Sequence, residues 1–301
     1  MPAAQDSPVP QALDRAAVCA LYAPARRGDG SADAHALRAP EMISRIVERR
    51  SRLATTSARL AALSVPVLIM AALGHRSGQL AATPTYAVMA LGFSLAALAV
   101  ITALVAYAGI WRDGRKGAGA ATRGLIIGLL VLALPGIGAW KLVTLPRLVD
   151  ISTNPEDPPL FEKAGADRAA DDEPIQEPGE DEINAQRDAY PDVVPRHYPV
   201  STARVYEEAR KIVGDRRWRI LEAREPSDTD ETAHIEAVAL TIIFGFRQDV
   251  AIRIVPDGDG ALVDMRSAAR NAAHDLGADA DRIRDFLTDL DTALQGVSGG
   301  S

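Results

Sequence analysis

Uncharged apolar residues dominate long stretches in the first half of the chain, and polar residues dominate most of the rest. The middle stretch has no charged residue from Tyr86 to Trp111, and the last runs from Gly124 to Leu145 with only Lys141 inside it. A helix rises about 1.5 Å per residue, so each stretch can cross a hydrocarbon core of roughly 30 Å. Both stretches therefore predict membrane-spanning helices.

The first apolar stretch reaches spanning length only if it includes a charged residue. Leu60 to Gly74 is uncharged, and a helix that begins near Leu53 adds enough length but carries Arg59. An arginine near a span end can extend its guanidinium to the head groups, whereas one at the bilayer centre costs about 2.5–3.5 kcal/mol. We therefore predict a three-helix transmembrane region at residues 41–148, with the lipid bilayer as its partner.

Basic residues are distributed unequally around these spans. They gather before the first span and in the second loop, at Arg45, Arg49, Arg50, Arg52, Arg112, Arg115, Lys116 and Arg123. The first loop, around 75–84, carries only His75 and Arg76. By the positive-inside rule, the N-terminus and the second loop are cytoplasmic. We expect a multi-pass protein of a bacterial cytoplasmic (inner) membrane, with the C-terminal domain in the periplasm.

Two segments have the composition of disordered chain. Residues 1–40 are rich in Ala, Pro, Gly and Asp without sustained periodicity, which predicts a disordered tail. Residues 149–197 are predicted to be an acidic, proline-rich linker, because 151–190 contain twelve Asp and Glu residues and three Lys and Arg residues. Only its beginning, 150–161, has the turn-forming residues and the apolar end of an ordered segment.

Residues 198–296 have the short periodic segments of a soluble domain. We predict an amphipathic helix at 202–213, strands at 217–223, 234–243, 250–255 and 261–267, and a last helix from about Asp279. Short connections favour antiparallel neighbours. The predicted fold is therefore a membrane α-helical region of three spans followed by a soluble α+β domain, a four-stranded antiparallel sheet with two helices on one face.

Several separate motifs resemble one protein family. They are DISTNPEDPPLF at Asp150–Phe161, Tyr190-Pro-Asp192, Phe244-Gly-Phe246, VDMRSAAR at Val263–Arg270, Asp275-Leu-Gly277 and RIRDFL at Arg282–Leu287. In this order they resemble the DUF1499 family over about residues 150–294, and three preceding membrane helices are also familiar from that family. Asn154 departs from the usual Asp, and the acidic insertion at 164–186 is longer than is typical. The resemblance implies a membrane-linked domain of uncharacterised function.

The sequence contains few motifs that indicate a cofactor, a metal site or a catalytic group. A net charge of −7 argues against nucleic-acid binding, and a single cysteine excludes an intrachain disulfide. No phosphate loop, dinucleotide fingerprint or metal-ligand spacing is present, so we predict no cofactor and no metal. Asp275, Asp279 and Asp281 suggest either calcium or, more simply, capping of the last helix. Ser267 with His274 and Asp275 could form a nucleophile with its helpers, but the elbow motif around the serine is absent.

Charged residues on one face of the predicted sheet are the candidate ligand site. Alternation places Arg253, Asp264 and Arg266 away from the core, with Arg270 following in the loop and Ser267 at the strand end. One interpretation is a solvated face held by cross-strand ion pairs. The other is an anion-recognition site of Arg253, Arg266, Ser267 and Arg270, because arginine forks bind carboxylate or phosphate in a bidentate manner.

These features favour an integral membrane protein that presents an extracytoplasmic binding or envelope-organising domain, and they favour a non-enzyme. The expected partner is an anionic envelope ligand or a membrane protein. The alternative is an envelope hydrolase or transferase that uses the Arg/Ser/Asp cluster of the C-terminal domain. A cleft holding an acid or base with a shifted pKa would favour the enzyme, and an open charged face would favour binding.

Overall fold

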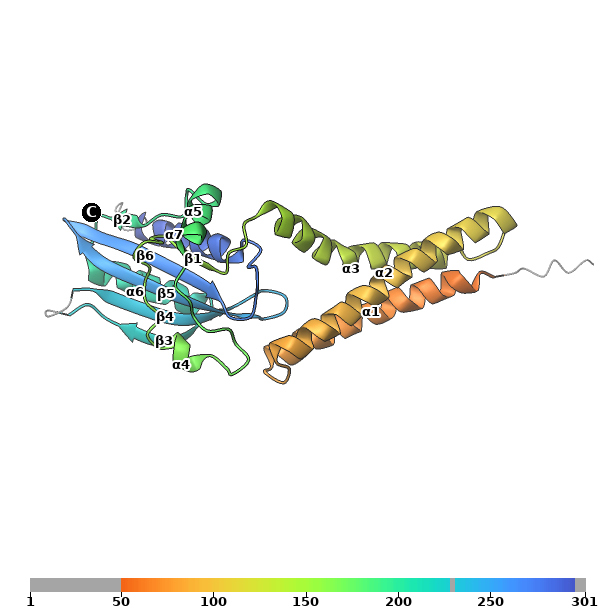
Figure 1. The fold of residues 1–301 in the computed structure, drawn as a ribbon, viewed down its shortest axis with the longest axis horizontal. Helices are drawn as coiled ribbons and strands as arrows, with labels where there is room; N and C mark the ends of the chain where they lie inside the picture. Colours follow the sequence, from red (N-terminus) through yellow and green to blue (C-terminus); the bar gives the residue numbers. More distant parts are fainter. Residues whose placement is uncertain (1–49, 228–230, 296–301) are drawn as a thin grey trace, which may run out of the picture. The chain divides into compact units, whose positions relative to one another are not determined.

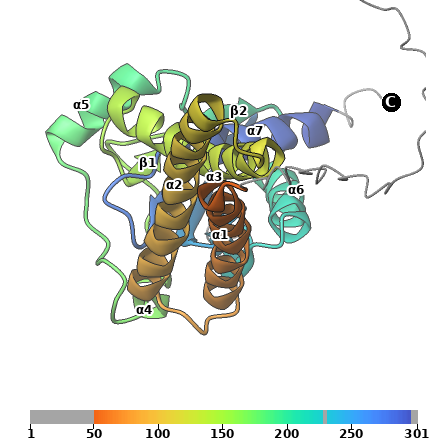
Figure 2. The same ribbon diagram turned by 90° about the vertical axis from the view of Figure 1, so that its right-hand side faces the viewer.

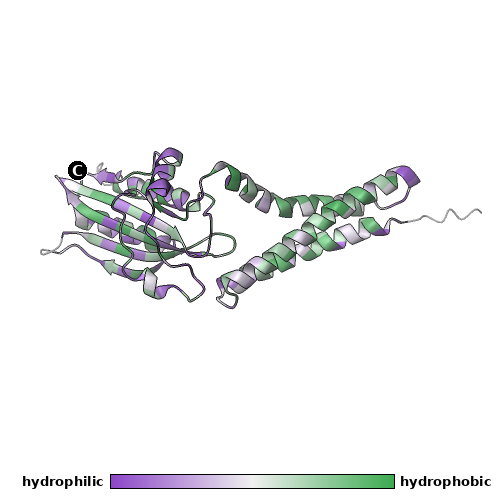
Figure 3. Cartoon of the chain, viewed as in Figure 1, coloured by the Kyte–Doolittle hydropathy of each residue, from purple (hydrophilic) through white to green (hydrophobic). Residues whose placement is uncertain are grey.

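Three long helices open the part of the chain that the computed structural model describes, which is residues 50–227 and 231–295 (Figure 1). They are α1 (Arg52–Arg76), α2 (Ala82–Asp113) and α3 (Ala118–Thr144). All three are long and apolar enough to cross a membrane, as Figure 3 shows by their hydropathy. The three predicted apolar helices are thereby confirmed. The tail predicted at 1–40 lies outside the described residues.

The three helices pack through small side chains. The buried positions include Ala54, Ser57, Ala61, Ser64 and Ala71 on α1, Gly92, Ala96, Ala99, Ala103 and Ala106 on α2, and Ala121, Gly124 and Gly128 on α3. A Cβ on Gly124 would lie 1.9 Å from Ser57 Oγ, so only glycine fits there. Ser57 Oγ donates to the Ala99 carbonyl at 2.8 Å. Close backbone approach and interhelical hydrogen bonds are typical of helices packed within lipid.

The second half of α3 leaves this bundle. All buried residues of α3 lie between Ala121 and Gly128, and Pro135 interrupts the helix further along. Proline removes a backbone hydrogen bond and bends a helix. Figure 1 shows α3 diverging from α2 beyond their shared segment, and Figure 2 shows α1 and α2 running next to each other. The end of α3 is therefore free to line a space of its own.

The soluble domain is built on an antiparallel sheet. Its strands are β1 (Asp150–Ser152), β2 (Arg196–Tyr198), β3 (Arg219–Arg224), β4 (Ala233–Leu240), β5 (Arg247–Asp257) and β6 (Gly260–Ala269). The order is β1-β6-β5-β4-β3, and β2 also pairs with β6. Helices α6 (Thr202–Asp215) and α7 (Ala278–Gln295) cover one face, where Val205, Ile252 and Phe286 are fully buried. The predicted antiparallel sheet with two helices is present.

The prediction of four strands was wrong, because the sheet has six. The two additional strands, β1 and β2, come from the range predicted as linker, which also holds the short helices α4 (Ala164–Asp167) and α5 (Glu180–Ala189). Both strands are three residues long and pair with β6. A three-residue strand has too few positions for alternation to appear, and the surrounding acidic residues have the composition of disordered chain.

We predict that residues 146–296 fold without the helices, whereas residues 198–296 do not fold cooperatively. The shorter fragment lacks β1, β2 and the segment that covers the second face of the sheet, so buried charges on that face lose their partners. Urea unfolding followed by circular dichroism checks this, with the longer fragment as the control. Equal, sharp transitions for the two fragments would contradict it.

Candidate functional site

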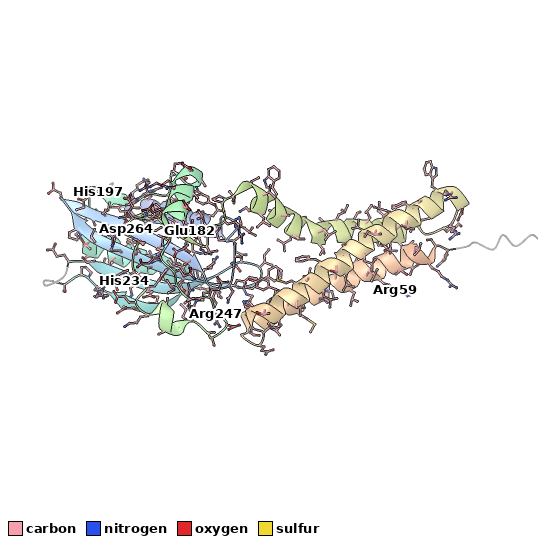
Figure 4. The ribbon with its side chains drawn as sticks, in the orientation of Figure 1. Arg59, Glu182, His197, His234, Arg247 and Asp264 are labelled. Carbon is pink, nitrogen blue, oxygen red and sulfur yellow. The ribbon has the colours of Figure 1, made fainter. Side chains whose placement is uncertain are left out.

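The face of the sheet opposite α6 and α7 is charged and covered. Antiparallel register places charged residues in rows: Glu236 beside Ala251 and Arg266, and His234 beside Arg253 and Asp264. Figure 4 labels His234 and Asp264 on this part of the sheet. The segment 153–178, which we call the strap, lies over these rows and bonds to them. Since Glu236, Asp264 and Arg266 are almost fully buried, this face is a polar interior layer.

Glu236 holds the strap through backbone amides. Its carboxylate accepts hydrogen bonds from the backbone N–H groups of Glu162 and Lys163, each at 2.9 Å, and of Ala164. Burial raises the pKa of Glu236, but the His234 ring and these three amides lower it, and the net pKa lies below its ordinary value. A charged carboxylate is therefore built into the layer.

Arg266 is bound on every side. Its guanidinium donates to Asp150 in a bidentate manner at 2.9 and 2.6 Å and to the Pro159 carbonyl at 3.3 Å. It also lies over the Phe161 ring, 4.7 Å from the centroid. Burial raises the pKa of Asp150, although the contact with Arg266 opposes that shift. Arg266 therefore ties β1 and the strap to β6.

Arg270 and Arg253 are paired in the same way. Arg270 is fully buried and donates to Asp249 at 2.5 Å and to Asp167 at 2.8 Å. Arg168 of the strap donates to the other oxygen of Asp249 at 2.9 Å. Arg253 contacts Asp264 at 2.8 Å and Asp157 at 3.0 Å. The carboxylates thus occupy the arginine forks that were predicted to bind an external anion.

Ser267 lies on the other face of the sheet, away from the three arginines. It is fully buried, and its Oγ donates to Asp279 Oδ1 at 2.6 Å. Arg282 donates to both of these residues. Complete burial raises the pKa of Asp279 well above its ordinary value, although Arg282 opposes the shift. The structure therefore brings Arg253, Arg266 and Arg270 into one layer and separates Ser267 from them.

His274 bonds to the end of α3, and Asp275 bonds to the start of α7. The Leu276 N–H donates to His274 Nδ1 at 2.9 Å, so Nε2 carries the proton and donates to the Leu145 carbonyl at 3.2 Å. Asp275 accepts from the N–H groups of Gly277 and Asp279, each at 2.9 Å, and caps the helix. Neither residue bonds to Ser267, so the three do not form a nucleophilic triad. No group of three His, Cys, Asp or Glu among residues 50–227 and 231–295 could hold a metal ion.

A cavity lies between the diverging helices and the domain. It has a volume of about 910 Å³, within the roughly 300–1,000 Å³ of small-molecule pockets. Its walls on α2 are Tyr86, Met89 and Phe93, which share one face of that helix. Helix α3 contributes Leu134, Pro135, Ile137, Gly138 and Lys141. The domain contributes apolar residues that include Trp218, Phe244 and Leu276. We call this space the junction pocket.

Direct contacts join the helices to the domain on two sides of the junction pocket. Tyr86 of α2 stacks on Phe246 with ring centroids 4.9 Å apart, and its hydroxyl donates to the Asn271 carbonyl at 2.6 Å. On the other side, Lys141 of α3 lies 3.5 Å from Asp281 of α7. Sequence patterns indicate Phe244 and Phe246 only as part of a motif, because their role depends on helices far away in the sequence. In the sequence, the helical spacing of Tyr86, Met89 and Phe93 indicates this wall of the junction pocket.

Two comparisons with known proteins bear on this chain. Residues 150–290 match the model of a family described as "Protein of unknown function (DUF1499)". The matched range begins at β1, includes the strap and ends within α7. The comparison with curated proteins found no match.

We predict that Arg270→Ala lowers the free energy of unfolding by about 3–5 kcal/mol, because it leaves the buried carboxylate of Asp249 without its fully buried partner. Arg210→Ala is the control, since Arg210 is exposed and its pairing with Glu225 is worth at most about 1 kcal/mol. Chemical denaturation of residues 146–296 measures both. A loss below 1 kcal/mol for Arg270→Ala would contradict a structural role.

Proposed function

Because residues 150–290 match the model of the DUF1499 family, whose description assigns no function, we propose a function from the geometry of the chain. The protein is a membrane-anchored binding protein that holds an amphiphile, such as a membrane lipid, in the junction pocket. The observation that carries this proposal is the apolar cavity of about 910 Å³ bounded by two candidate membrane spans and by the domain.

The mostly apolar walls of the junction pocket suit an apolar occupant. An empty cavity loses dispersion contacts along its walls, and water finds few polar partners among Met89, Phe93 and Leu134. Acyl chains are the apolar molecules available at that depth of a bilayer. The polar groups of the pocket include Lys141, Thr241 and Gln248, which suit the polar end of the same molecule. An amphiphile matches both parts of the lining.

This proposal moves the binding site away from the polar layer. An anion-recognition site of Arg253, Arg266, Ser267 and Arg270 stays a prediction. The carboxylates and the strap already bind these arginines, which argues against such a site. The same burial argues against the hydrolase or transferase alternative. Ser267 has no exposed surface, and a nucleophile has to reach its substrate.

We also propose the orientation that the basic residues favour. The loop between α2 and α3 carries Arg115 and Lys116, and Arg50 and Arg52 precede or begin α1. The positive-inside rule places these ends in the cytoplasm and the domain on the opposite side. For a bacterial inner membrane, that side is the periplasm. The junction pocket then lies at the level of the outer leaflet, where it can bind lipid directly from the bilayer.

We predict that Gly138→Leu reduces the amount of lipid that stays bound to the purified protein several-fold. Gly138 lines the junction pocket, and a Cβ there would meet Leu276 at 3.6 Å, an ordinary contact, so the rest of the leucine fills the cavity. The matched control is Gly136→Leu on the same helix, where a Cβ meets nothing within 4 Å. Native mass spectrometry from mild detergent counts the bound lipid. Equal retention by both variants would contradict the proposed function.

The orientation predicts which cysteines a membrane-impermeant maleimide labels from outside. In a Cys19→Ser background, Asp259→Cys in the exposed β5–β6 turn should react in intact spheroplasts, and Arg115→Cys should react only after lysis. Labelling in the opposite order would reverse the orientation.

A further inference from the structure

The loop between β4 and β5, residues 240–246, carries apolar side chains that the domain does not bury. Ile242 is 92% exposed and Ile243 is 51% exposed. The base of the loop is ordered, since the Thr241 N–H donates to the Phe246 carbonyl and the Phe246 N–H donates to Thr241 Oγ1, both at 2.9 Å. Gly245 adopts a left-handed conformation with φ of 74°. The fold thus holds two isoleucines out of its own core.

This loop lies beside the ends of the candidate membrane spans. Arg76, the last residue of α1, donates to the carbonyls of Thr241 at 3.2 Å and Ile242 at 2.6 Å. Phe246 contacts His75 of α1 at a ring-centroid distance of 4.6 Å, in addition to Tyr86 of α2. Residues at the ends of spans lie at the depth of the lipid head groups. The exposed isoleucines therefore belong at the membrane surface.

The covalent connection imposes the same placement. Helix α3 ends at Thr144 and β1 begins at Asp150. Even a fully extended chain spans at most about 3.6 Å per residue, so this connection reaches at most about 20 Å. Leu148 is buried in the domain, and its carbonyl accepts from the Asp275 N–H at 3.0 Å, which shortens the reach further. The domain cannot leave the bilayer surface.

Three arginines at the span ends or beside the loop have no carboxylate partner among the described residues. Within residues 50–227 and 231–295, no ion pair is found for Arg76, Arg147 or Arg247, whereas Arg253, Arg266 and Arg270 are all paired. Arg147 lies in the short connection, and Arg247 begins β5 directly after the loop (Figure 4). Nearby acids offset part of this charge: Asp275 and Asp285 line the same space, and Glu173 lies near Tyr86. Asp281 is bound by Lys141 and Arg284. The edge combines apolar side chains with excess positive charge, as membrane-binding surfaces do.

We propose that Ile242 and Ile243 insert into the head-group region of the bilayer that α1–α3 cross, and that Arg76, Arg147 and Arg247 bind the phosphates of anionic lipids there. The occupant of this surface is the lipid leaflet itself, because the spans and the short connection hold the loop against it. Ile242, Ile243 and Arg247 also line the domain side of the junction pocket, so this inference extends the proposed function.

The experiment uses the full-length chain with Cys19→Ser, reconstituted in vesicles of phosphatidylcholine with or without phosphatidylglycerol. An environment-sensitive fluorophore is attached at Ile242→Cys, and at Asp259→Cys as the control on the turn at the other end of β5. We expect blue-shifted emission at 242 and strong quenching by nitroxide lipids labelled near the head group, with little quenching at 259. Emission at 242 that matches 259 would overturn the proposal, and so would a blue shift without lipid quenching, which indicates a protein partner or a second copy.

The arginines are tested in the same vesicles. With phosphatidylglycerol present, Arg147→Gln combined with Arg247→Gln should lower quenching at 242 at least two-fold, to the level seen in phosphatidylcholine alone. Arg210→Gln on the exposed surface of α6 is the matched control and should leave quenching unchanged. Quenching that is equal for the double variant and the control would overturn the assignment of anionic lipid to this edge. Because Ile242 also lines the junction pocket, the label at 242 is measured again with Gly138→Leu: quenching that persists there comes from the leaflet, and quenching that is lost together with the bound lipid would overturn the proposal.

Discussion

Charge pairing between the strap and the sheet is the interaction on which the domain depends. A sheet with helices on one face normally leaves the other face to water, yet here Glu236, Asp249 and Arg270 have no exposed surface. A buried charge is tolerated only if opposite charges or hydrogen bonds compensate it. The strap supplies that compensation with its amides, with Arg168 and with Asp167, and its order depends in turn on the charges beneath it. The cover and the sheet are therefore parts of one folding unit.

This pairing also separates the arginines into two groups with different uses. The arginines of the polar layer are already paired with carboxylates. An external anion would have to displace Asp150 from Arg266 or Asp249 from Arg270. Near the spans, Arg147 and Arg247 have no carboxylate partner within the described residues, and Arg76 donates to two backbone carbonyls. Lipid recognition at that edge and at the junction pocket thus needs no rearrangement of the fold.

The sequence predicted whatever depends on local periodicity. The uncharged runs identified the three helices, and alternation along β5 and β6 placed Arg253, Asp264 and Arg266 on the correct face. Local periodicity did not predict the strap, because the groups that neutralise its acids are distant along the chain. Asp167 pairs with Arg270, and the amides near Glu162 bind Glu236. The junction pocket was likewise beyond local patterns. It exists because α3 diverges after Gly128 and brings its far end toward β4 and α7.

The short connection between α3 and β1 determines how this domain meets other molecules. With its helices in a bilayer, the start of β1 stays within about 20 Å of the end of α3, so a ligand that diffuses within the membrane meets the domain in two dimensions rather than three. Confinement of this kind raises the local concentration of the ligand without any new contact. Weak intrinsic affinity is then sufficient for high occupancy, and exchange with the surrounding lipid can remain fast.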